Sequence, residues 1–288
     1  MRIAVASGKG GTGKTTIATS LALSLANQEE VWYLDCDVEA PNGHLFLKPA
    51  FSQESPAMVR IPQIQADRCN LCGKCVEVCQ FHALAKVGAN ILIFPQLCHG
   101  CGSCTWNCPE SAISEIPNPI GMLESGLTGA GIHFLRGLLT ISEPMAKPVI
   151  QQLKQSNHPP DRAVVILDAP PGASCPVVET LRGADFAMLV TEPTPFGLHD
   201  LKQMIGIVRE MGIPAGVVVN RDGIGDSQMD KYLAQNRIPV LLRVPFDKNL
   251  AMGLAAGRSL IEILPDYRPQ LLDVFQHILA LVQEEMQP

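Results

Sequence analysis

Short apolar runs, turn residues and helical stretches alternate along most of this chain. Residues 2–6 form a first strand-length run, and residues 31–34 form a second. Between them lie a glycine-rich turn at 8–13 and a stretch from Lys14 to Ala26 with apolar residues at helical spacing. A strand, loop, helix and strand in this order are typical of a parallel α/β sheet, because parallel strands need a crossover connection.

The alternation stops at about Ile61 and returns after Gly121. The segment between them is rich in cysteine and turn residues. Beyond it, apolar runs of strand length lie at 163–167, 186–190, 215–219 and 240–244, and helical stretches at 175–181, 198–211, 227–235 and 269–285. The pattern predicts a mostly parallel α/β sheet flanked by helices, formed by residues 1–59 and 119–288, with an inserted domain at 60–118.

Composition narrows the classes of function. The chain has 288 residues, of which 47% are apolar and 17% charged, so a sizeable core is possible. Its formal net charge of -6 argues against general nucleic-acid binding. No apolar run is long enough for a membrane span, and the N-terminus lacks the features of a secretory signal. We therefore expect a cytoplasmic protein.

The C-terminal stretch predicts a helix packed on the core. Its apolar stripe consists of Leu271, Leu272, Phe275, Ile278, Leu279 and Val282. No lysine or arginine follows Arg268, whereas a helix that binds anionic membranes carries basic residues on its polar face. We therefore expect no membrane anchor.

The turn at 8–13 carries a phosphate-binding signature. The residues Gly8, Lys9, Gly10, Gly11, Thr12, Gly13, Lys14 and Thr15 match G-x-x-x-x-G-K-[ST], and Thr16 follows them. Glycines let backbone N–H groups wrap around phosphate oxygens, and the following helix adds its positive dipole end. Lys14 is expected to neutralise the β- and γ-phosphates, and the Thr15 hydroxyl to ligate Mg²⁺. The alternative is a chance match in a flexible turn.

Lys9 adds a second lysine inside this loop. The run from Lys9 to Thr16 resembles the deviant Walker A motif of the MinD/ParA superfamily, which includes the nitrogenase iron protein and the cytosolic iron–sulfur carrier ATPases. The resemblance covers the chain outside the insertion. It implies ATP as the substrate and an ATP-dependent homodimer, in which Lys9 reaches the partner's nucleotide. The alternative for Lys9 is a solvated loop charge.

Three aspartates follow strand-length runs, where the superfamily has its acidic residues. Asp35 and Asp37 lie two residues apart at the end of the second run, and Asp168 ends a later one. By resemblance, Asp37 orients the attacking water, whereas Asp35 and Asp168 lie on the Mg²⁺ side. Gly172 then belongs to a switch segment that can approach the γ-phosphate. Taken singly, each aspartate could instead cap a helix or a turn.

Two later strand runs end in candidate base-contacting residues. Asn220 and Arg221 follow the run at 215–219, and Pro245 and Asp247 follow the run at 240–244. These positions are similar to the superfamily's base contacts at the carboxyl edge of the sheet, where ligands bind in such folds. Asn220 could instead be a turn residue with left-handed backbone.

Eight of the ten cysteines form an internal repeat between Cys69 and Cys108. Two runs read C-x₂-C-x₂-C-x₃-C, and the second lies 29 residues after the first. This is the spacing of bacterial two-cluster ferredoxins, in which the fourth cysteine of each run ligates the other cluster. One [4Fe-4S] cluster is therefore expected on Cys69, Cys72, Cys75 and Cys108, and the other on Cys98, Cys101, Cys104 and Cys79.

Zinc is the alternative for these cysteines, since four thiolates also bind it. Zinc sites usually divide their cysteines into two separated pairs, whereas each run here has three at even spacing. Gln80 follows Cys79 where the ferredoxin signature has proline, at a position that is not a ligand. His82 and His99 lie near the runs and either tune cluster potentials or are exposed loop residues.

Two cysteines lie outside the runs. Cys36 is expected to be a small buried residue. Cys175 opens a helical stretch, where the pKa of a thiol tends to fall, so it is either a packing residue or a redox-sensitive or transient metal ligand. No further C-x-x-C pair exists outside the insertion. The superfamily's iron–sulfur carriers typically have such a pair near the C-terminus, so its absence argues against a simple carrier mechanism.

The order of motifs resembles MinD-superfamily ATPases with an inserted ferredoxin domain. That resemblance implies an α+β, bacterial-ferredoxin-like βαββαβ module that projects from the P-loop domain. Three functions remain open: ATP-gated electron transfer to a protein redox partner, assembly or delivery of a metallocluster to a partner, and a positional switch with structural or redox-sensing clusters. The first two share Mg-ATP hydrolysis coupled to bound clusters, and we favour them jointly.

Overall fold

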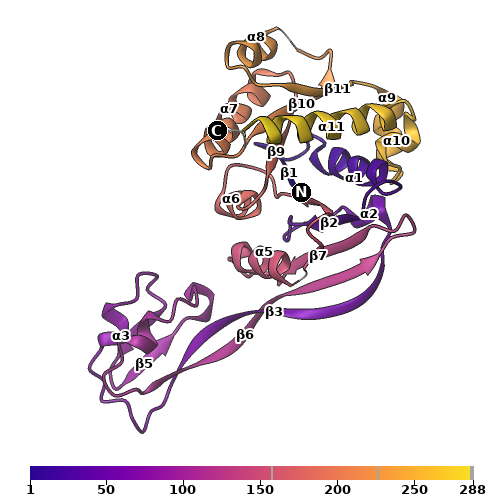
Figure 1. The fold of residues 1–288 in the computed structure, drawn as a ribbon. Coiled ribbons are helices and arrows are strands. Elements are labelled where there is room, and N and C mark those ends of the chain that lie inside the picture. Colours follow the sequence, from indigo (N-terminus) through magenta and orange to yellow (C-terminus); the bar gives the residue numbers. More distant parts are fainter. Residues whose placement is uncertain (157, 226, 286–288) are drawn as a thin grey trace.

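Strands form the centre of the fold. The computed structural model describes residues 1–285 except 157 and 226. Its parallel strands are β1 (Arg2–Ala6), β2 (Val31–Asp35), β7 (His133–Leu139), β8 (Val164–Asp168), β9 (Phe186–Thr191), β10 (Ala215–Asp222) and β11 (Val240–Pro245), and the antiparallel strands β3 (Ala50–Ile64) and β6 (Ile113–Leu127) extend one edge. Across the described residues the sheet order is β11-β10-β9-β1-β8-β2-β7-β6-β3 (Figure 1). The predicted mostly parallel sheet is confirmed.

Helices cover both faces of this sheet. One face carries α1 (Lys14–Leu25), α9 (Lys248–Ala255), α10 (Leu260–Ile263) and α11 (Tyr267–Glu285), and the other carries α5 (Ala146–Gln155), α6 (Cys175–Leu181), α7 (Pro195–Glu210) and α8 (Gln228–Gln235). The central strand β1 supplies both cores, since Ile3 and Val5 pack on the first face and Ala4 and Ala6 on the second. A strand buried on both faces therefore appears in the sequence as a continuous apolar run.

The C-terminal helix α11 belongs to the core. Leu271 and Ile278 are fully buried, and α11 contacts α1 and β11. The prediction of a helix packed on the core is thus confirmed. Within the described ranges, no helix combines the length and apolar character needed to cross a membrane.

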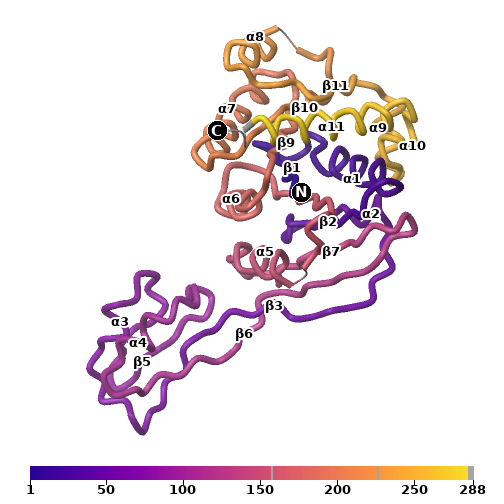
Figure 2. Tube along the Cα trace, in the orientation of Figure 1, coloured from indigo at the N-terminus to yellow at the C-terminus, as the bar shows by residue number. Residues whose placement is uncertain are grey.

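The insertion stands on a long antiparallel ribbon. Strands β3 and β6 pair from Ala50 opposite Leu127 to Ile64 opposite Ile113. Beyond them lie α3 (Lys74–Glu77), the hairpin of β4 (Leu84–Val87) and β5 (Asn90–Ile93), the 3₁₀ turn η1 (Pro95–Leu97) and α4 (Ser103–Trp106). Figures 1 and 2 show this small unit at the far end of the ribbon, away from the P-loop domain. The helices and strands of this segment follow in the order β3-α3-β4-β5-α4-β6.

The predicted domain limits fall inside strands. The limit between 59 and 60 lies within β3, and the limit between 118 and 119 lies within β6. Both strands cross these points while keeping their pairing, with Arg60 opposite Pro117. The ribbon is therefore shared by the sheet and the small unit.

Candidate functional site

The loop between β1 and α1 has the backbone of a phosphate-binding turn. Gly11 and Gly13 have φ values of 78° and 91°, which side chains rarely allow. A Cβ on Gly13 would collide with Asn220 Nδ2, so a larger residue would displace the Asn220 side chain. The hydroxyl Oγ1 of Thr12 is buried without a hydrogen-bond partner among the described residues. A ligand oxygen in this loop would satisfy it.

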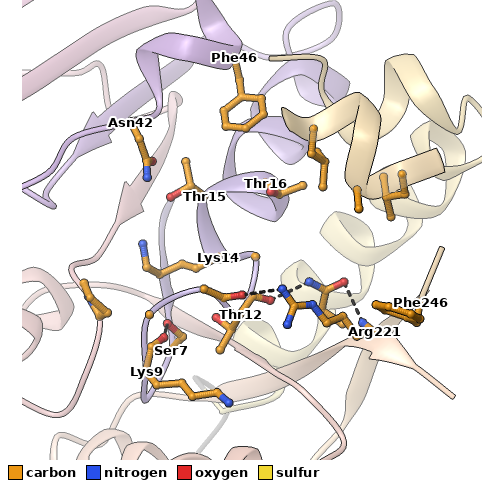
Figure 3. A pocket seen from close by; sticks show the side chains of 18 of the residues that line it. Ser7, Lys9, Thr12, Lys14, Thr15, Thr16, Asn42, Phe46, Arg221 and Phe246 are labelled. Atoms are coloured by element: carbon orange, nitrogen blue, oxygen red, sulfur yellow. Dashed lines mark hydrogen bonds between the residues drawn. The ribbon is translucent and has the colours of Figure 1, made fainter. Parts of the chain in front are cut away.

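This loop lines a cavity of about 450 Å³ at the carboxyl edge of the sheet. That volume lies within the usual range for small-molecule sites. Of the predicted residues, the lining includes Lys9, Gly10, Gly11, Thr12, Gly13, Lys14, Thr15, Thr16, Asp37, Asn220, Arg221, Pro245 and Asp247 (Figure 3). Gly8, Asp35, Asp168 and Gly172 lie outside it; Gly172 donates its N–H to Ser7 O at 3.0 Å, next to the loop.

Lys14 is paired with Asp168 beneath the cavity. Its Nζ lies 2.7 Å from Asp168 Oδ1, with side-chain exposures of 7% and 0%. Burial lowers the pKa of Lys14, but attraction to Asp168 outweighs this effect and the net pKa is raised. The lysine is therefore held as a cation directly below the loop.

The second oxygen of Asp168 has a partner that no sequence motif predicts. The Tyr33 hydroxyl donates to Asp168 Oδ2 at 2.8 Å. Burial and the adjacent carboxylates raise the pKa of Tyr33 well above its ordinary value, so the phenol remains a donor. No motif marks Tyr33, because it lies in an apolar strand where an aromatic residue suggests only packing.

The two candidate carboxylates at and just after the end of β2, Asp35 and Asp37, differ in environment. Asp35 is fully buried and accepts hydrogen bonds from Gly43 N at 2.9 Å and Asp37 N at 3.3 Å. Burial and then Asp168 raise the pKa of Asp35 to about 7. Asp37 is half-buried and borders the cavity with Lys14 and Thr15. Asp37 is thus accessible to a ligand, whereas Asp35 lies behind it.

Glu192 forms ion pairs with two residues that line the cavity, Lys9 and Arg221. Its Oε2 lies 3.1 Å from Lys9 Nζ and its Oε1 lies 2.6 Å from Arg221 Nη1, although its side chain is only 7% exposed. Arg221 has φ 54° and donates from Nη2 to Gly11 O at 3.2 Å. Sequence reasoning missed Glu192, since nothing along the chain links the end of β9 to Lys9.

The part of the cavity where base contacts are predicted combines apolar and polar residues. Asn220 Nδ2 donates to Thr12 O at 2.7 Å, so Asn220 supports the loop itself, and Arg221, not Asn220, has the left-handed backbone. Asp247 Oδ1 accepts from Leu250 N at 2.9 Å and caps α9. Phe46, from the short helix α2 (His44–Leu47), also lines the cavity (Figure 3).

The eight clustered cysteines line two separate small cavities. One is lined by Cys69, Cys72, Cys75 and Cys108, and the other by Cys79, Cys98, Cys101 and Cys104. In both, the fourth cysteine of a run accepts a backbone N–H four residues on: Ala83 N to Cys79 Sγ and Ala112 N to Cys108 Sγ, each at 3.3 Å. Among the residues that the structure describes, no three His, Cys, Asp or Glu side chains are arranged to hold a single metal ion.

The rims of these cavities differ in character. Phe81 borders the cavity of Cys98 and stacks on His99 at 3.7 Å, and the exposed Leu97 and Trp106 lie beside Cys98 and Gly102. Their counterparts 29 positions away are the exposed polar residues Glu110, Arg68 and Glu77. One cavity is therefore flanked by an apolar rim of Phe81, Leu97 and Trp106, whereas the three matching positions of the repeat are charged.

The remaining candidates lie apart from these cavities. Cys36 is fully buried, as predicted, and burial raises the pKa of its thiol to about 12. Cys175 is exposed at the start of α6, so it is not a packing residue. His82 is exposed in a turn with φ 52°.

A family profile matches most of the chain. Residues 3–260 match the CobQ/CobB/MinD/ParA nucleotide binding domain. The chain belongs to this family. Its members bind nucleotides, which agrees with the loop and the cavity described above.

Relatives and solved structures extend this result. The chain is similar to protein MJ0579 of Methanocaldococcus jannaschii, with 30% identity over 91% of this chain and 92% of that protein. It is also similar to a cytosolic Fe-S cluster assembly factor NUBP2 homolog of Nematostella vectensis, with 25% identity over 91% and 85%. Its fold resembles the cell division ATPase MinD of Pyrococcus furiosus, with a TM-score of 0.55, 18% identity and coverage of 96% and 98%.

Proposed function

We propose that this chain is an ATPase that hydrolyses Mg-ATP as an ATP-dependent homodimer and holds two [4Fe-4S] clusters at the end of the β3/β6 ribbon. The nucleotide state then governs electron transfer or metallocluster assembly. One observation carries the proposal: each cysteine cavity combines three thiols of one run with the last thiol of the other. A two-cluster bacterial ferredoxin uses this crossed combination.

The donor set fits the clusters. Each cavity offers four free cysteines, and no other residue type supplies a soft ligand there. Four thiolates around one zinc ion crowd together at about 2.3 Å from the metal. Thiolates around a cubane stand further apart, because each ligates a different iron. When bound, the clusters supply one-electron transfer, at potentials set by exposure and by hydrogen bonds such as Ala83 N to Cys79 Sγ.

The cavity residues suit phosphoryl transfer to water. The loop N–H groups bind the phosphates, and Lys14 neutralises their charge once it turns from Asp168. Thr15 and Asp168 would hold Mg²⁺ with Asp35 behind them; the ion supplies charge neutralisation at the phosphates. Asp37, at the open edge of the cavity, orients the attacking water.

The position of Lys9 is evidence in favour of the proposed dimer. Its side chain is 35% exposed and borders its own cavity, where the ammonium lies 3.1 Å from Glu192 Oε2. A lysine in this position can leave Glu192 for the γ-phosphate of a facing subunit, because its flexible stem carries a compact charge. Of its two ion pairs, Glu192 would then keep the one with Arg221.

Helix α5 offers a physical route between nucleotide and clusters. Its Lys154 Nζ donates to the carbonyls of Glu179, Thr180 and Arg182 at the end of α6, at 2.7, 3.0 and 2.6 Å. Two residues earlier, Gln152 exchanges hydrogen bonds of 2.9 Å with Met58 N and O on β3. A shift of α6, which follows Asp168 and Gly172, would therefore pass to the ribbon that carries the clusters.

The apolar rim supports a protein partner at one cluster. Trp106 is 90% exposed beside the cavity of Cys98, whereas its repeat counterpart is Glu77. Exposed aromatic residues are enriched at protein interfaces. The similarity to the NUBP2 homolog favours cluster assembly, and the fold shared with MinD favours the second candidate, a positional switch with structural or redox-sensing clusters.

Anaerobic reconstitution tests the proposal. The purified chain should bind about eight iron atoms, show the spectra of [4Fe-4S] clusters, and hydrolyse ATP only with Mg²⁺. Stoichiometric zinc without iron uptake would overturn the cluster assignment. Absence of Mg-dependent turnover in the reconstituted protein would overturn the ATPase assignment.

A further inference from the structure

Tyr33 holds one side of a carboxylate that the proposed reaction uses on its other side. Asp168 has no solvent exposure, and each of its carboxylate oxygens accepts a hydrogen bond from a side chain: Oδ1 from Lys14 Nζ and Oδ2 from Tyr33 Oη. Two fixed partners on opposite oxygens determine the rotation of a carboxylate about its Cβ–Cγ bond. The Asp168 side chain is therefore oriented before any ligand enters.

The phenol itself has little freedom to move. The Tyr33 ring is fully buried and stacks on Phe134 of β7, with centroids 5.5 Å apart and planes at 10°. At its outer end, a Cβ on Gly43 would lie 2.8 Å from Tyr33 Cε1 and 3.0 Å from its hydroxyl. Tyr33 thus extends from a packed ring to a single acceptor, which makes it a rigid support for Asp168.

The two partners of Asp168 differ in what nucleotide binding does to them. Lys14 is needed at the phosphates and must leave Oδ1, whereas Tyr33 has no role at the phosphates and lies outside the cavity lining. A second cation would cancel the charge of the carboxylate. A neutral phenol orients the carboxylate and leaves its charge in place. The full negative charge of Asp168 then remains available to a divalent cation.

We propose that Tyr33 is the positioning residue for Asp168, fixing Oδ2 so that Oδ1 is presented to the magnesium of bound Mg-ATP after Lys14 departs. This inference rests on the proposed function and adds a residue that no motif marks. Magnesium demands near-ideal ligand geometry, so a freely rotating Asp168 would bind it less tightly. Nucleotide binding without the metal would not depend on Tyr33.

Calorimetric titration of a non-hydrolysable ATP analogue into the cluster-loaded full chain, with Mg²⁺ or with EDTA, tests the inference. We expect Tyr33→Phe to weaken binding with Mg²⁺ by about tenfold, as for loss of a hydrogen bond to a charged group, and to leave binding in EDTA within about twofold of wild type. Tyr267→Phe, which removes a phenol bond of 3.1 Å to Arg243 O, is the matched control and should change neither value.

The outcomes separate the inference from the function on which it rests. Wild type whose affinity does not increase with Mg²⁺ contradicts the proposed function and this inference together. Wild type that responds to Mg²⁺ while Tyr33→Phe responds equally overturns the inference alone. Equal weakening of Tyr33→Phe with and without Mg²⁺ would assign Tyr33 to packing; unchanged iron content and melting temperature verify that the variant is folded.

Discussion

Lys14 Nζ lies 2.7 Å from Asp168 Oδ1, although bound nucleotide would draw the lysine to phosphate and the aspartate to metal. The pair neutralises two buried charges that would otherwise be costly to bury. Mg-ATP offers each member a replacement partner of opposite charge. Nucleotide binding therefore exchanges one set of ion pairs for another.

Removing the lysine should abolish hydrolysis and destabilise the nucleotide-free protein. We expect Lys14→Ala to reduce ATP turnover by about 100-fold or more and to lower the free energy of unfolding by about 3–5 kcal/mol, because Asp168 remains buried without a counter-charge. Lys14→Ala/Asp168→Ala should recover part of that stability. Phosphate release and urea titration measure the two effects; full turnover in Lys14→Ala would contradict the P-loop assignment.

Releasing Lys9 from Glu192 should favour the dimer. We expect Glu192→Gln to form the ATP-bound dimer at a several-fold lower protein concentration, because Lys9 no longer leaves an ion pair of 3.1 Å in order to cross the interface. Sedimentation with a non-hydrolysable analogue measures this shift. Glu179→Gln is the matched control, since Glu179 is equally buried beside Lys147 and Arg182. A dimer of Glu192→Gln no tighter than wild type would contradict the role given to this pair.

Asp35 should make the nucleotide-free protein less stable as the pH rises. Its pKa is about 7 when folded and 3.8 ordinarily, so between these values the unfolded chain loses a proton that the folded chain keeps. The cost grows through this window and is constant above it. We expect the stability advantage of Asp35→Asn to increase by about 2 kcal/mol from pH 5 to pH 8. Urea midpoints at both pH values decide this, and a pH-independent difference would contradict it.

Single cysteine variants should reveal the crossed ligand sets. Cys79→Ala and Cys104→Ala should each remove the same half of the iron, so their combination loses no more than either alone. Cys79→Ala combined with Cys75→Ala should lose both clusters. Iron analysis and absorbance measure the loss, with Cys36→Ala as the control that keeps all the iron. An additive loss for Cys79→Ala with Cys104→Ala would assign these cysteines to different clusters.

Lys154 should be needed for coupling and not for either site alone. We expect Lys154→Met to keep its iron and its affinity for ATP, but to reduce the effect of nucleotide on the cluster spectrum, because α6 loses three hydrogen bonds to α5. Lys147→Met, on the same helix and half exposed, is the control. An undiminished nucleotide effect in Lys154→Met would exclude this route.

Local sequence patterns predicted those parts of the candidate sites that are formed by residues close together in the chain. The loop around Lys14 and the grouping of the cysteines around two cavities followed from residue spacing, because both depend on residues close together along the chain. The buried strands followed from their apolar runs. Strand β7 and helix α5 were not predicted, since Gly137 interrupts one and Pro148 lies inside the other.

Long-range contacts escaped prediction. The pairing of β3 with β6 joins residues far apart in sequence, and its strands carry Pro56, Pro62 and Pro117, which normally argue against a strand. Tyr33 and Glu192 acquire their roles only when distant segments meet at the sheet edge. By residue type alone, Tyr33 in an apolar strand indicates packing, and Glu192 indicates a solvated surface residue.

In the proposed function, nucleotide state and cluster state are linked in one chain. Anaerobic electron paramagnetic resonance of the reduced protein, with and without Mg-ATP and with Lys14→Ala as the control, tests it most directly. We expect signals of reduced [4Fe-4S] clusters that change when Mg-ATP is added to wild type and do not change in Lys14→Ala. Clear cluster signals that are identical with and without Mg-ATP in wild type would contradict the coupling and favour the positional switch.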